Sequence, residues 1–238
     1  MKKITFYSLI AYILINVSAT DLKAQEQSNK KLYSSTSLEI IFSFAEVGAD
    51  SISISNVMRF APVVNFQWLL NYDMSKNFGV YSGLDIRNLG FIRENLAVDP
   101  NLKFKHRVYT FGLPLGLKVG DLDNGVFVYF GGQVEWAWNY KEKRFEDKEK
   151  VDKFVEWNSK RVNQIQTSAF VGINFPYGMN IKFKYYFTDL LNEDFVQYDA
   201  NGTANYPYAG QRSQIFYFSI NFFMFHPTRN YYKKVQRD

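Results

Sequence analysis

The sequence predicts an all-β protein that folds as an eight-stranded antiparallel up-and-down transmembrane β-barrel. Three observations carry this prediction: eight segments alternate apolar with polar residues, their connections alternate long with short, and the charges within the segments lie on the polar side of the alternation. Aromatic residues make up 18% of the 238-residue chain, yet its mean hydropathy is only −0.26, as expected when apolar and polar residues interleave. A barrel of this length commonly forms one domain.

The first element is a predicted secretory signal peptide over residues 1–24. Lys2 and Lys3 precede an apolar run over residues 4–17, and a small-residue cleavage site follows at Ala24. An uncleaved anchor is the alternative, but the run is shorter than the roughly 20 residues of a spanning helix. Because the chain has no cysteine, attachment of a lipid to cysteine is excluded. Residues 25–36 are then expected to form a short periplasmic segment.

Eight strand-like segments follow and define a barrel domain over residues 37–225. They cover residues 37–46, 58–72, 78–90, 106–119, 126–140, 162–175, 179–190 and 212–225. Most exceed the ~5–6 residues of strands in soluble sheets and reach the 9–11 residues of a tilted transmembrane strand. Strand length therefore favours a membrane barrel, followed by a basic periplasmic tail over residues 226–238.

The alternation can be followed along the chain. The first three segments carry their charges on one parity: Glu39, Arg59, and Asp85 with Arg87. In the fourth, Tyr109, Phe111, Leu113, Leu115, Leu117 and Val119 oppose Thr110, Gly112, Pro114, Gly116 and Lys118. In the fifth, Val126, Val128, Phe130, Val134, Trp136, Trp138 and Tyr140 oppose Tyr129, Gly131, Gln133, Glu135 and Asn139. The last two place Met179, Ile181, Phe183, Tyr185, Phe187, Phe216, Phe218, Ile220, Phe222 and Met224 on the apolar parity.

The connections support the same architecture. They are 11, 5, 15, 6, 21, 3 and 21 residues long in chain order. Outer membrane barrels have long extracellular loops and short periplasmic turns, and an even strand number leaves both termini in the periplasm. A soluble lipocalin-like barrel has no reason to keep every second turn tight.

The charges within the strands indicate which face is outside. All eight lie on the polar parity: Glu39, Arg59, Asp85, Arg87, Lys118, Glu135, Lys182 and Lys184. Arg107 lies on the apolar parity, but at a strand end, where a lipid-facing charge costs only about 0–1 kcal/mol. A soluble barrel would carry its charges outside, so this pattern predicts a charged lumen and an apolar outer surface.

An eight-stranded barrel has an interior that side chains can fill, so a diffusion pore is not expected. We expect the inward charges to form buried ion pairs within two groups. By height, Glu39, Lys118, Lys182 and Lys184 lie toward the periplasm, and Arg59, Asp85, Arg87 and Glu135 toward the outside. The functional alternative is a path for protons or small ions.

Small residues in the fourth strand fit the same lumen. Gly112, Pro114 and Gly116 all lie on the inward parity, where they make room in a narrow barrel. Pro114 removes one ladder hydrogen bond, so a local irregularity is expected there first. At the strand ends, aromatic side chains predict the two interfacial girdles: Trp136, Trp138 and Tyr140 at one rim, Trp68 and Tyr72 at the other.

These segments carry a family resemblance. The resemblance is carried by the stretch TFGLPLGLKVG, followed by a short turn and GVFVYFGGQVEW, and then by MNIKFKYYFTDLLN. In these stretches the chain resembles the outer membrane β-barrel domain common in Bacteroidota, which is called PorT-like. A signal peptide ending in Ala-Gln is similar to those of the same group. The likeness covers nearly all of the mature chain. It implies an outer membrane scaffold, and for some members an accessory role in the secretion machinery that serves gliding and protein export.

The long loops are the candidate contact sites of a non-enzymatic barrel that is structural or binds a partner. Loops 141–161 and 191–211 present aromatic residues among charged or polar ones: Phe145, Phe154, Trp157, Tyr198, Tyr206 and Tyr208. Expected partners are outer membrane lipid, lipopolysaccharide or a glycan, and a protein bound through the loops or the basic tail. For loop 141–161, a merely solvated charged surface is the alternative.

The sequence gives little support for a catalytic site, a cofactor site, a metal site or nucleic-acid binding. The two histidines are His226, beyond the last strand, and His106, with Glu94 or Asp99 as candidate partners for a lipid A-modifying enzyme; no spacing supports such a site. No cysteine and no histidine pair indicates a metal site, and no cofactor is expected. The net charge of +5 is spread without a nucleic-acid-binding motif.

Overall fold

The computed structural model describes residues 32–48, 54–94, 102–147, 149–199 and 201–223. The predicted signal peptide and basic tail, and with them His226 and Asp99, lie outside the described residues. The strands are β1 (Leu32–Gly48), β2 (Ile54–Ala61), β3 (Phe66–Asp73), β4 (Phe78–Arg93), β5 (Leu102–Asp121), β6 (Val126–Glu146), β7 (Glu149–Trp157), β8 (Ile165–Asn174), β9 (Met179–Tyr186), β10 (Gln197–Tyr198), β11 (Ala204–Asn205) and β12 (Arg212–Phe223). A 3₁₀ turn, η1 (Pro176–Gly178), joins β8 to β9.

In the part of the chain that the structure describes, no helix is both long and apolar enough to cross a membrane.

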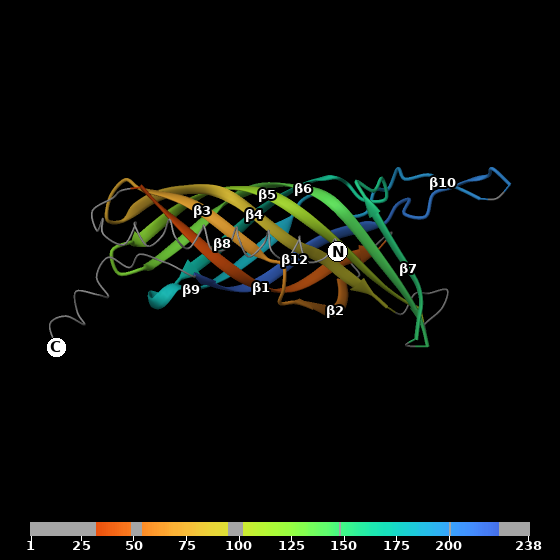
Figure 1. Ribbon diagram of the computed structural model, residues 1–238, viewed down its shortest axis with the longest axis horizontal. Coiled ribbons are helices and arrows are strands. Elements are labelled where there is room, and N and C mark those ends of the chain that lie inside the picture. The colour runs from red at the N-terminus through yellow and green to blue at the C-terminus, as the bar shows by residue number, and fades with distance from the viewer. Residues whose placement is uncertain (1–31, 49–53, 95–101, 148, 200, 224–238) are drawn as a thin grey trace, which may run out of the picture.

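The strands close into an antiparallel barrel of eight positions, which confirms the predicted fold class. Neighbours pair in the order β1, β3, β4, β5, β6, β8, β9 and β12, and β12 returns to β1 over Ser37–Gly48. Figure 1 shows the tilted strands, with tight turns at one end and β7 and β10 projecting at the other. We call the end with the long connections the outer end. The β2 strand shares the second position with β3, because both pair with β1.

The second predicted strand is therefore broken. Residues 58–72 were expected to be continuous, but Pro62–Asn65 leaves the ladder, and Val64 adopts a positive φ of 62°. Pro62 has no N–H to donate to the ladder, and the left-handed conformation of Val64 turns the chain away from it. Above it, no ladder joins β2 to β4 among the described residues; instead Arg59 Nη1 donates to the Asn88 carbonyl at 3.1 Å.

Pro114 disturbs the sheet less than Pro62 does. Pairing with β6 continues through Pro114 and Gln133 without a shift of register. On the β4 side the register is also kept, but the ladder skips two pairs between Ser82–Leu115 and Asp85–Gly112. The Ser82 hydroxyl, which lies on the outward parity, donates to the Pro114 carbonyl at 2.8 Å. The irregularity is thus a short gap in one ladder.

The loop expected over residues 141–161 is largely a β-hairpin. The β6 strand continues to Glu146, and β7 pairs back onto it. A bulge lies where β5 passes from Tyr109 to Thr110, because Trp138 in β6 has no opposite partner there. Because of this extra residue, the side chains of β6 beyond the bulge, toward the outer end, point to the opposite face of the sheet from the one their sequence parity predicts. Tyr140 is consequently 0% exposed and points inward, so its predicted place in the outer girdle is wrong.

The outward face is apolar over the height of a membrane. On β5 the outward side chains from Tyr109 to Val119 cover 11 residues, which matches a transmembrane strand. Leu115 is 67% exposed and Leu113 61% exposed, which a soluble barrel would not tolerate over its whole circumference. Trp136, Trp68 and Tyr72 are also exposed on this outward face. The 20-residue β5 and 21-residue β6 therefore extend beyond the band at the outer end.

Candidate functional site

The centre of the lumen is a hydrogen-bonded ion network around Arg87. Its Nε donates to Glu39 Oε2 at 3.0 Å, and its Nη1 lies 2.7 Å from Asp85 Oδ2 and 3.3 Å from Glu135 Oε1. Gln133 accepts from the same Nη1 at 2.8 Å and donates to Asp85 Oδ2 at 2.6 Å. The guanidinium fork thus joins three strands through charge-assisted bonds.

Two lysines complete the network. Lys182 lies 2.9 Å from Glu39 Oε1, and Lys184 forms an ion pair with Glu135. Glu135 also accepts from Thr110 at 2.6 Å and from Tyr186 at 2.8 Å. With three carboxylates and three cations the network is formally neutral, which is the condition under which buried charges are tolerated.

The pairing differs from the two groups expected by height. Glu39, expected with the periplasmic lysines, also binds Arg87 of the outer group, and Lys184 binds Glu135. Strands in a closed barrel tilt and stagger, so residues at unequal distances from their strand ends meet at one level. The six charges form one layer instead of two.

The other two inward charges lie outside this layer. Lys118 binds Asp73 at 2.7 Å, Tyr33 at 2.9 Å and Asn71 at 3.1 Å toward the tight turns. Arg59 bonds to Asn88 across the break between β2 and β4, and no carboxylate among the described residues pairs with it. All eight predicted charges are therefore buried, with two serving separate sites.

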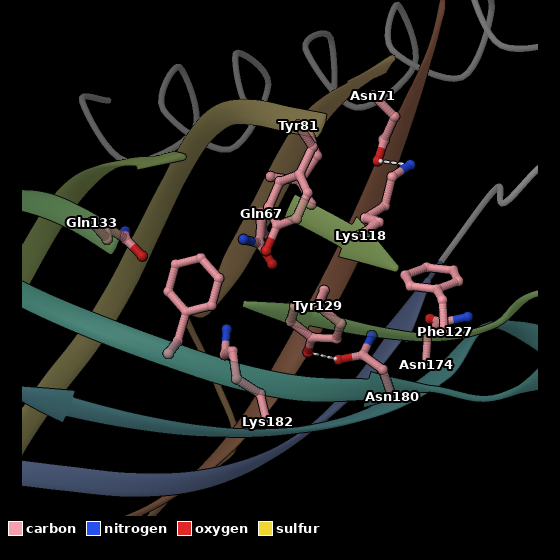
Figure 2. A pocket seen from close by; sticks show the side chains of 12 residues that line it. Gln67, Asn71, Tyr81, Lys118, Phe127, Tyr129, Gln133, Asn174, Asn180 and Lys182 are labelled. Atoms are coloured by element: carbon pink, nitrogen blue, oxygen red, sulfur yellow. Dashed lines mark hydrogen bonds between the residues drawn. The ribbon is translucent and has the colours of Figure 1, made fainter. Parts of the chain in front are cut away.

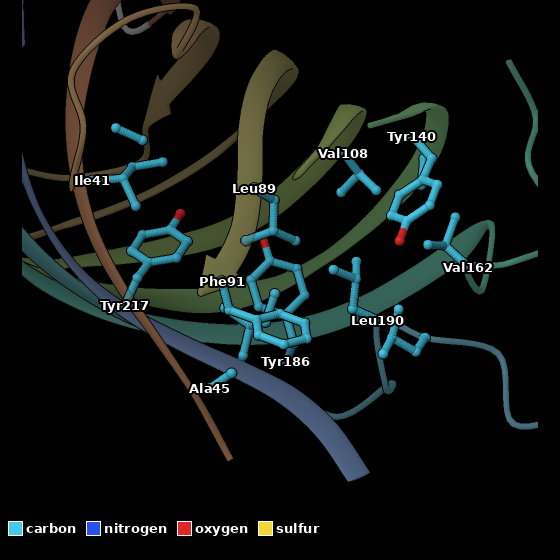
Figure 3. Packing of buried hydrophobic residues seen from close by; sticks show 14 of the residues in the cluster. Ile41, Ala45, Leu89, Phe91, Val108, Tyr140, Val162, Tyr186, Leu190 and Tyr217 are labelled. Carbon is cyan, nitrogen blue, oxygen red and sulfur yellow. The ribbon is translucent and has the colours of Figure 1, made fainter. Parts of the chain in front are cut away.

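Apolar layers close the lumen on both sides of the network. Toward the outer end, side chains of β1, β2, β4, β5, β6, β9 and β12 meet those of the segments before β8 and after β9. Figure 3 shows this layer, which includes Ile41, Leu89, Phe91, Val108, Leu190 and Tyr217. Toward the turns lie Leu69, Tyr81, Phe127, Tyr129 and Phe170. All five line a cavity of about 30 Å³, which is also bordered by Gln133 and Lys182 on the side of the network and by Lys118 on the side of the turns (Figure 2). That space suits one or two waters and no continuous channel.

A small polar cluster seals the outer mouth, above the membrane band. Tyr140 donates to Glu142 Oε2 at 2.6 Å, so His106 Nδ1, 2.9 Å from the Tyr140 oxygen, is left as the donor to it. His106 Nε2 has no hydrogen-bond partner among the described residues. Burial, reinforced by Arg93, lowers the pKa of His106 to about 3.

This cluster predicts a pH effect on stability. In the unfolded chain His106 takes up a proton below pH 6.5, whereas in the folded chain it stays neutral down to about pH 3, so stability falls as the pH drops through this window. At pH 6 the loss is about 1 kcal/mol. We expect His106→Asn, which retains an N–H donor, to remove this part of the slope in urea titrations at pH 7.5 and pH 6. An unchanged slope would contradict a buried neutral imidazole.

The six predicted loop contacts have different surroundings. Trp157, Tyr198 and Tyr206 are 67%, 69% and 55% exposed. Tyr208 is only 5% exposed and bonds to Glu142 at 3.4 Å, because the segment before β12 folds over the mouth. Phe154 packs on Tyr140 and under Arg161, and Phe145 lies beneath Lys105 with 5.0 Å from Nζ to the ring. Only the first three present a free aromatic surface.

Four residues that bond to the predicted charges were not assigned to the network from the sequence. They are Gln133, Thr110, Tyr186 and Asp73. The sequence placed Gln133 and Thr110 on the inward parity, but parity does not say which inward side chains bond to which charge. Asp73 ends β3, where parity gives no signal.

The described residues form no group of three or more His, Cys, Asp or Glu side chains with metal-site geometry. His106 has no serine within hydrogen-bond reach among its described partners, which are Tyr140 and Glu142, and it is buried. Glu94 pairs with Lys103 instead.

Comparisons with known proteins give structural neighbours only. No protein-family model and no curated protein matches the sequence. The chain is similar to Ail, the attachment invasion locus protein of Yersinia pestis, solved with the heparin analogue sucrose octasulfate (11% identity, TM-score 0.40, 82% of this chain and 100% of that one). It is also similar to Neisserial surface protein A (10%, 0.34, 80% and 98%) and to CarO2 of Acinetobacter baumannii (11%, 0.33, 79% and 99%). The fold assignment rests on the strand pairing described above.

Proposed function

We propose that this protein is a non-enzymatic outer membrane β-barrel that is exported through a cleaved signal peptide, contributes to envelope structure and binds partners at its outer end. The observation that carries the proposal is the inversion of polarity: an exposed apolar face surrounds a lumen of paired charges. Such a surface is stable only in lipid, and closed barrels with this polarity belong to outer membranes.

The filled lumen argues for a scaffold and against a pore. Arg87 and its partners occupy the middle of the barrel, and apolar side chains close it above and below. Opening a path for ions would separate buried charges that are paired at 2.7–3.3 Å, which is costly.

We therefore expect the purified barrel to give no large, stable conductance steps in planar lipid bilayers. A matched variant, Gly132→Ala, which leaves the charge network in place, should be equally silent. Frequent long-lived openings of the wild-type barrel would overturn the filled-lumen model and with it this proposal.

Partner binding is supported by the outer extension. The β6–β7 hairpin extends above the membrane band, with Trp157 exposed at its base, and the segment carrying Tyr198 and Tyr206 projects from the same end of the barrel (Figure 1). Aromatic side chains on a rigid hairpin lose little conformational entropy on binding. Stable secretion components recovered with the barrel from detergent-solubilised membranes would instead favour the accessory role that the PorT-like resemblance implies.

A further inference from the structure

A basic cluster covers the outward face of the strands just above the membrane band. It consists of Lys105 and Arg107 on β5, Lys141 and Lys143 on β6, and Lys150 and Lys153 on β7. The β5 and β6 strands continue from the membrane-spanning part of the barrel, and β7 pairs with β6, so the cluster is held on regular strand structure.

Strand register places these cations directly opposite one another. Arg107 is opposite Lys141, Lys105 is opposite Lys143, and Lys143 is opposite Lys153 on its other side. Like charges at opposed positions destabilise a sheet. In an isolated sheet, a carboxylate at one of these positions would increase stability by forming an ion pair with the opposed cation.

The cluster lacks that compensation. None of its six cations forms an ion pair with a carboxylate in the described ranges, whereas the neighbouring Lys103 binds Glu94. Partial burial, reinforced by Arg107 and the neighbouring lysines, lowers the pKa of both Lys141 and Lys143. The face therefore has an excess of positive charge that an external anion would neutralise.

The height of the cluster indicates where this anion comes from. Directly below it, Trp138 stacks on Trp157 at 4.9 Å and on Tyr109 at 5.8 Å between ring centroids. Arg107 Nη1 donates to the Tyr109 hydroxyl at 2.8 Å, which ties the cationic row to the aromatic one. Aromatic belts mark the membrane interface, and below this one the face is apolar, with Phe111 and Leu113 exposed.

We propose that the six cations bind the phosphate groups of outer-leaflet lipopolysaccharide, with the lipid acyl chains lying along the apolar face below them. The proposal rests on the outer membrane location proposed above. Arginine offers a fork that fits phosphate, and lysines supply point charges around it. A soluble polyanion would make no use of the continuity between the cationic row and the apolar face.

The test uses the purified barrel in zwitterionic detergent and bisphosphorylated lipid A as the probe. Lys105→Gln/Lys143→Gln removes one opposed pair, and Lys76→Gln/Lys160→Gln is the matched control at exposed positions outside the cluster. We expect the first variant to bind lipid A about 25-fold more weakly, about fivefold per cation, and the control to change less than twofold. Equal loss in both variants would contradict the site.

A stability measurement separates the site from a folding defect. Without lipid A, the Lys105→Gln/Lys143→Gln barrel should unfold at an equal or higher urea concentration than wild type, because repulsion is relieved. When lipid A is added, the urea concentration needed for unfolding should rise more for the wild-type barrel than for the variant. Equal stabilisation of wild type by dephosphorylated lipid A, or full displacement of lipid A by millimolar inorganic phosphate, would overturn the proposal. An open pore in bilayers would refute the filled-lumen function without affecting this binding result.

Discussion

Replacing Arg87 with methionine should lower the free energy of unfolding by about 3–5 kcal/mol, because it leaves buried carboxylates without their shared partner. Arg87 touches Glu39, Asp85 and Glu135, and both sides of these pairs are almost fully buried. Methionine fills similar volume, so the loss reports the uncompensated charge rather than a cavity. Urea titration of the barrel in phospholipid vesicles, read by the gel shift of the folded form, measures it.

Two variants bracket this result. Arg144→Met removes an arginine whose side chain is 47% exposed in its pair with Glu146, and it should change stability by no more than about 0.5 kcal/mol. Arg87→Lys keeps the charge but loses the fork, and an intermediate loss is expected. If Arg87→Met were as stable as wild type, the network would not hold the lumen together.

The eight buried charges show what alternation alone can predict. Glu39, Lys182 and the others were assigned to the lumen because the period of a strand is two and lipid rejects charge. The partner of each charge depends on the tilt and stagger of the strands in the closed barrel, and the alternation of residues along a strand gives no information on either. The joining of Glu39 to Arg87 could therefore be seen only in three dimensions.

Tyr140 shows where alternation fails. Its parity is that of Trp136 and Trp138 in the sequence, but the bulge at Trp138 inserts one residue and turns every later side chain of β6 to the opposite face. Nothing in the local sequence marks this bulge, since aromatic residues stand on both sides of it. The same reversal aligns Lys141 and Lys143 with Arg107 and Lys105, so the basic cluster was invisible from parity.

The positions of prolines and the composition of the loops also predicted only part of the structure. Pro114 and Pro62 both remove a ladder donor, yet only Pro62 begins a break. Val64, two residues after Pro62, adopts a left-handed conformation, and Asn65 bonds to the Ala61 carbonyl at 2.7 Å. The charged stretch after Tyr140 looked like a loop since it lacks apolar alternation. Above the membrane a strand needs no apolar face, and pairing with β7 is sufficient.

Gly116→Ala should destabilise the barrel by about 1–3 kcal/mol through overpacking of the lumen. A methyl group there would lie 2.6 Å from Cε1 and from the hydroxyl oxygen of Tyr81. The ring cannot easily retreat, because it packs edge-on against Tyr129 at 6.2 Å and against Phe170 at 6.3 Å. Gly132→Ala is the matched control, since its nearest contact would be the Ser168 carbonyl at 3.6 Å, and it should be neutral or slightly stabilising.

A second substitution tests whether lumen volume is the cause. Tyr81→Leu removes the hydroxyl and the ring edge that meet the new methyl group, so in its presence Gly116→Ala should cost less than it does alone. The coupling free energy in this double-mutant cycle should be about 1 kcal/mol or more, as expected for two residues in contact. Additive losses would show that Gly116 is needed for its backbone and not for the space it leaves. The same urea titration gives the free energies of unfolding of the wild type, the two single variants and the double variant. A smaller loss from Gly116→Ala in the presence of Tyr81→Leu would show that Gly116 is needed for the packing of a narrow lumen.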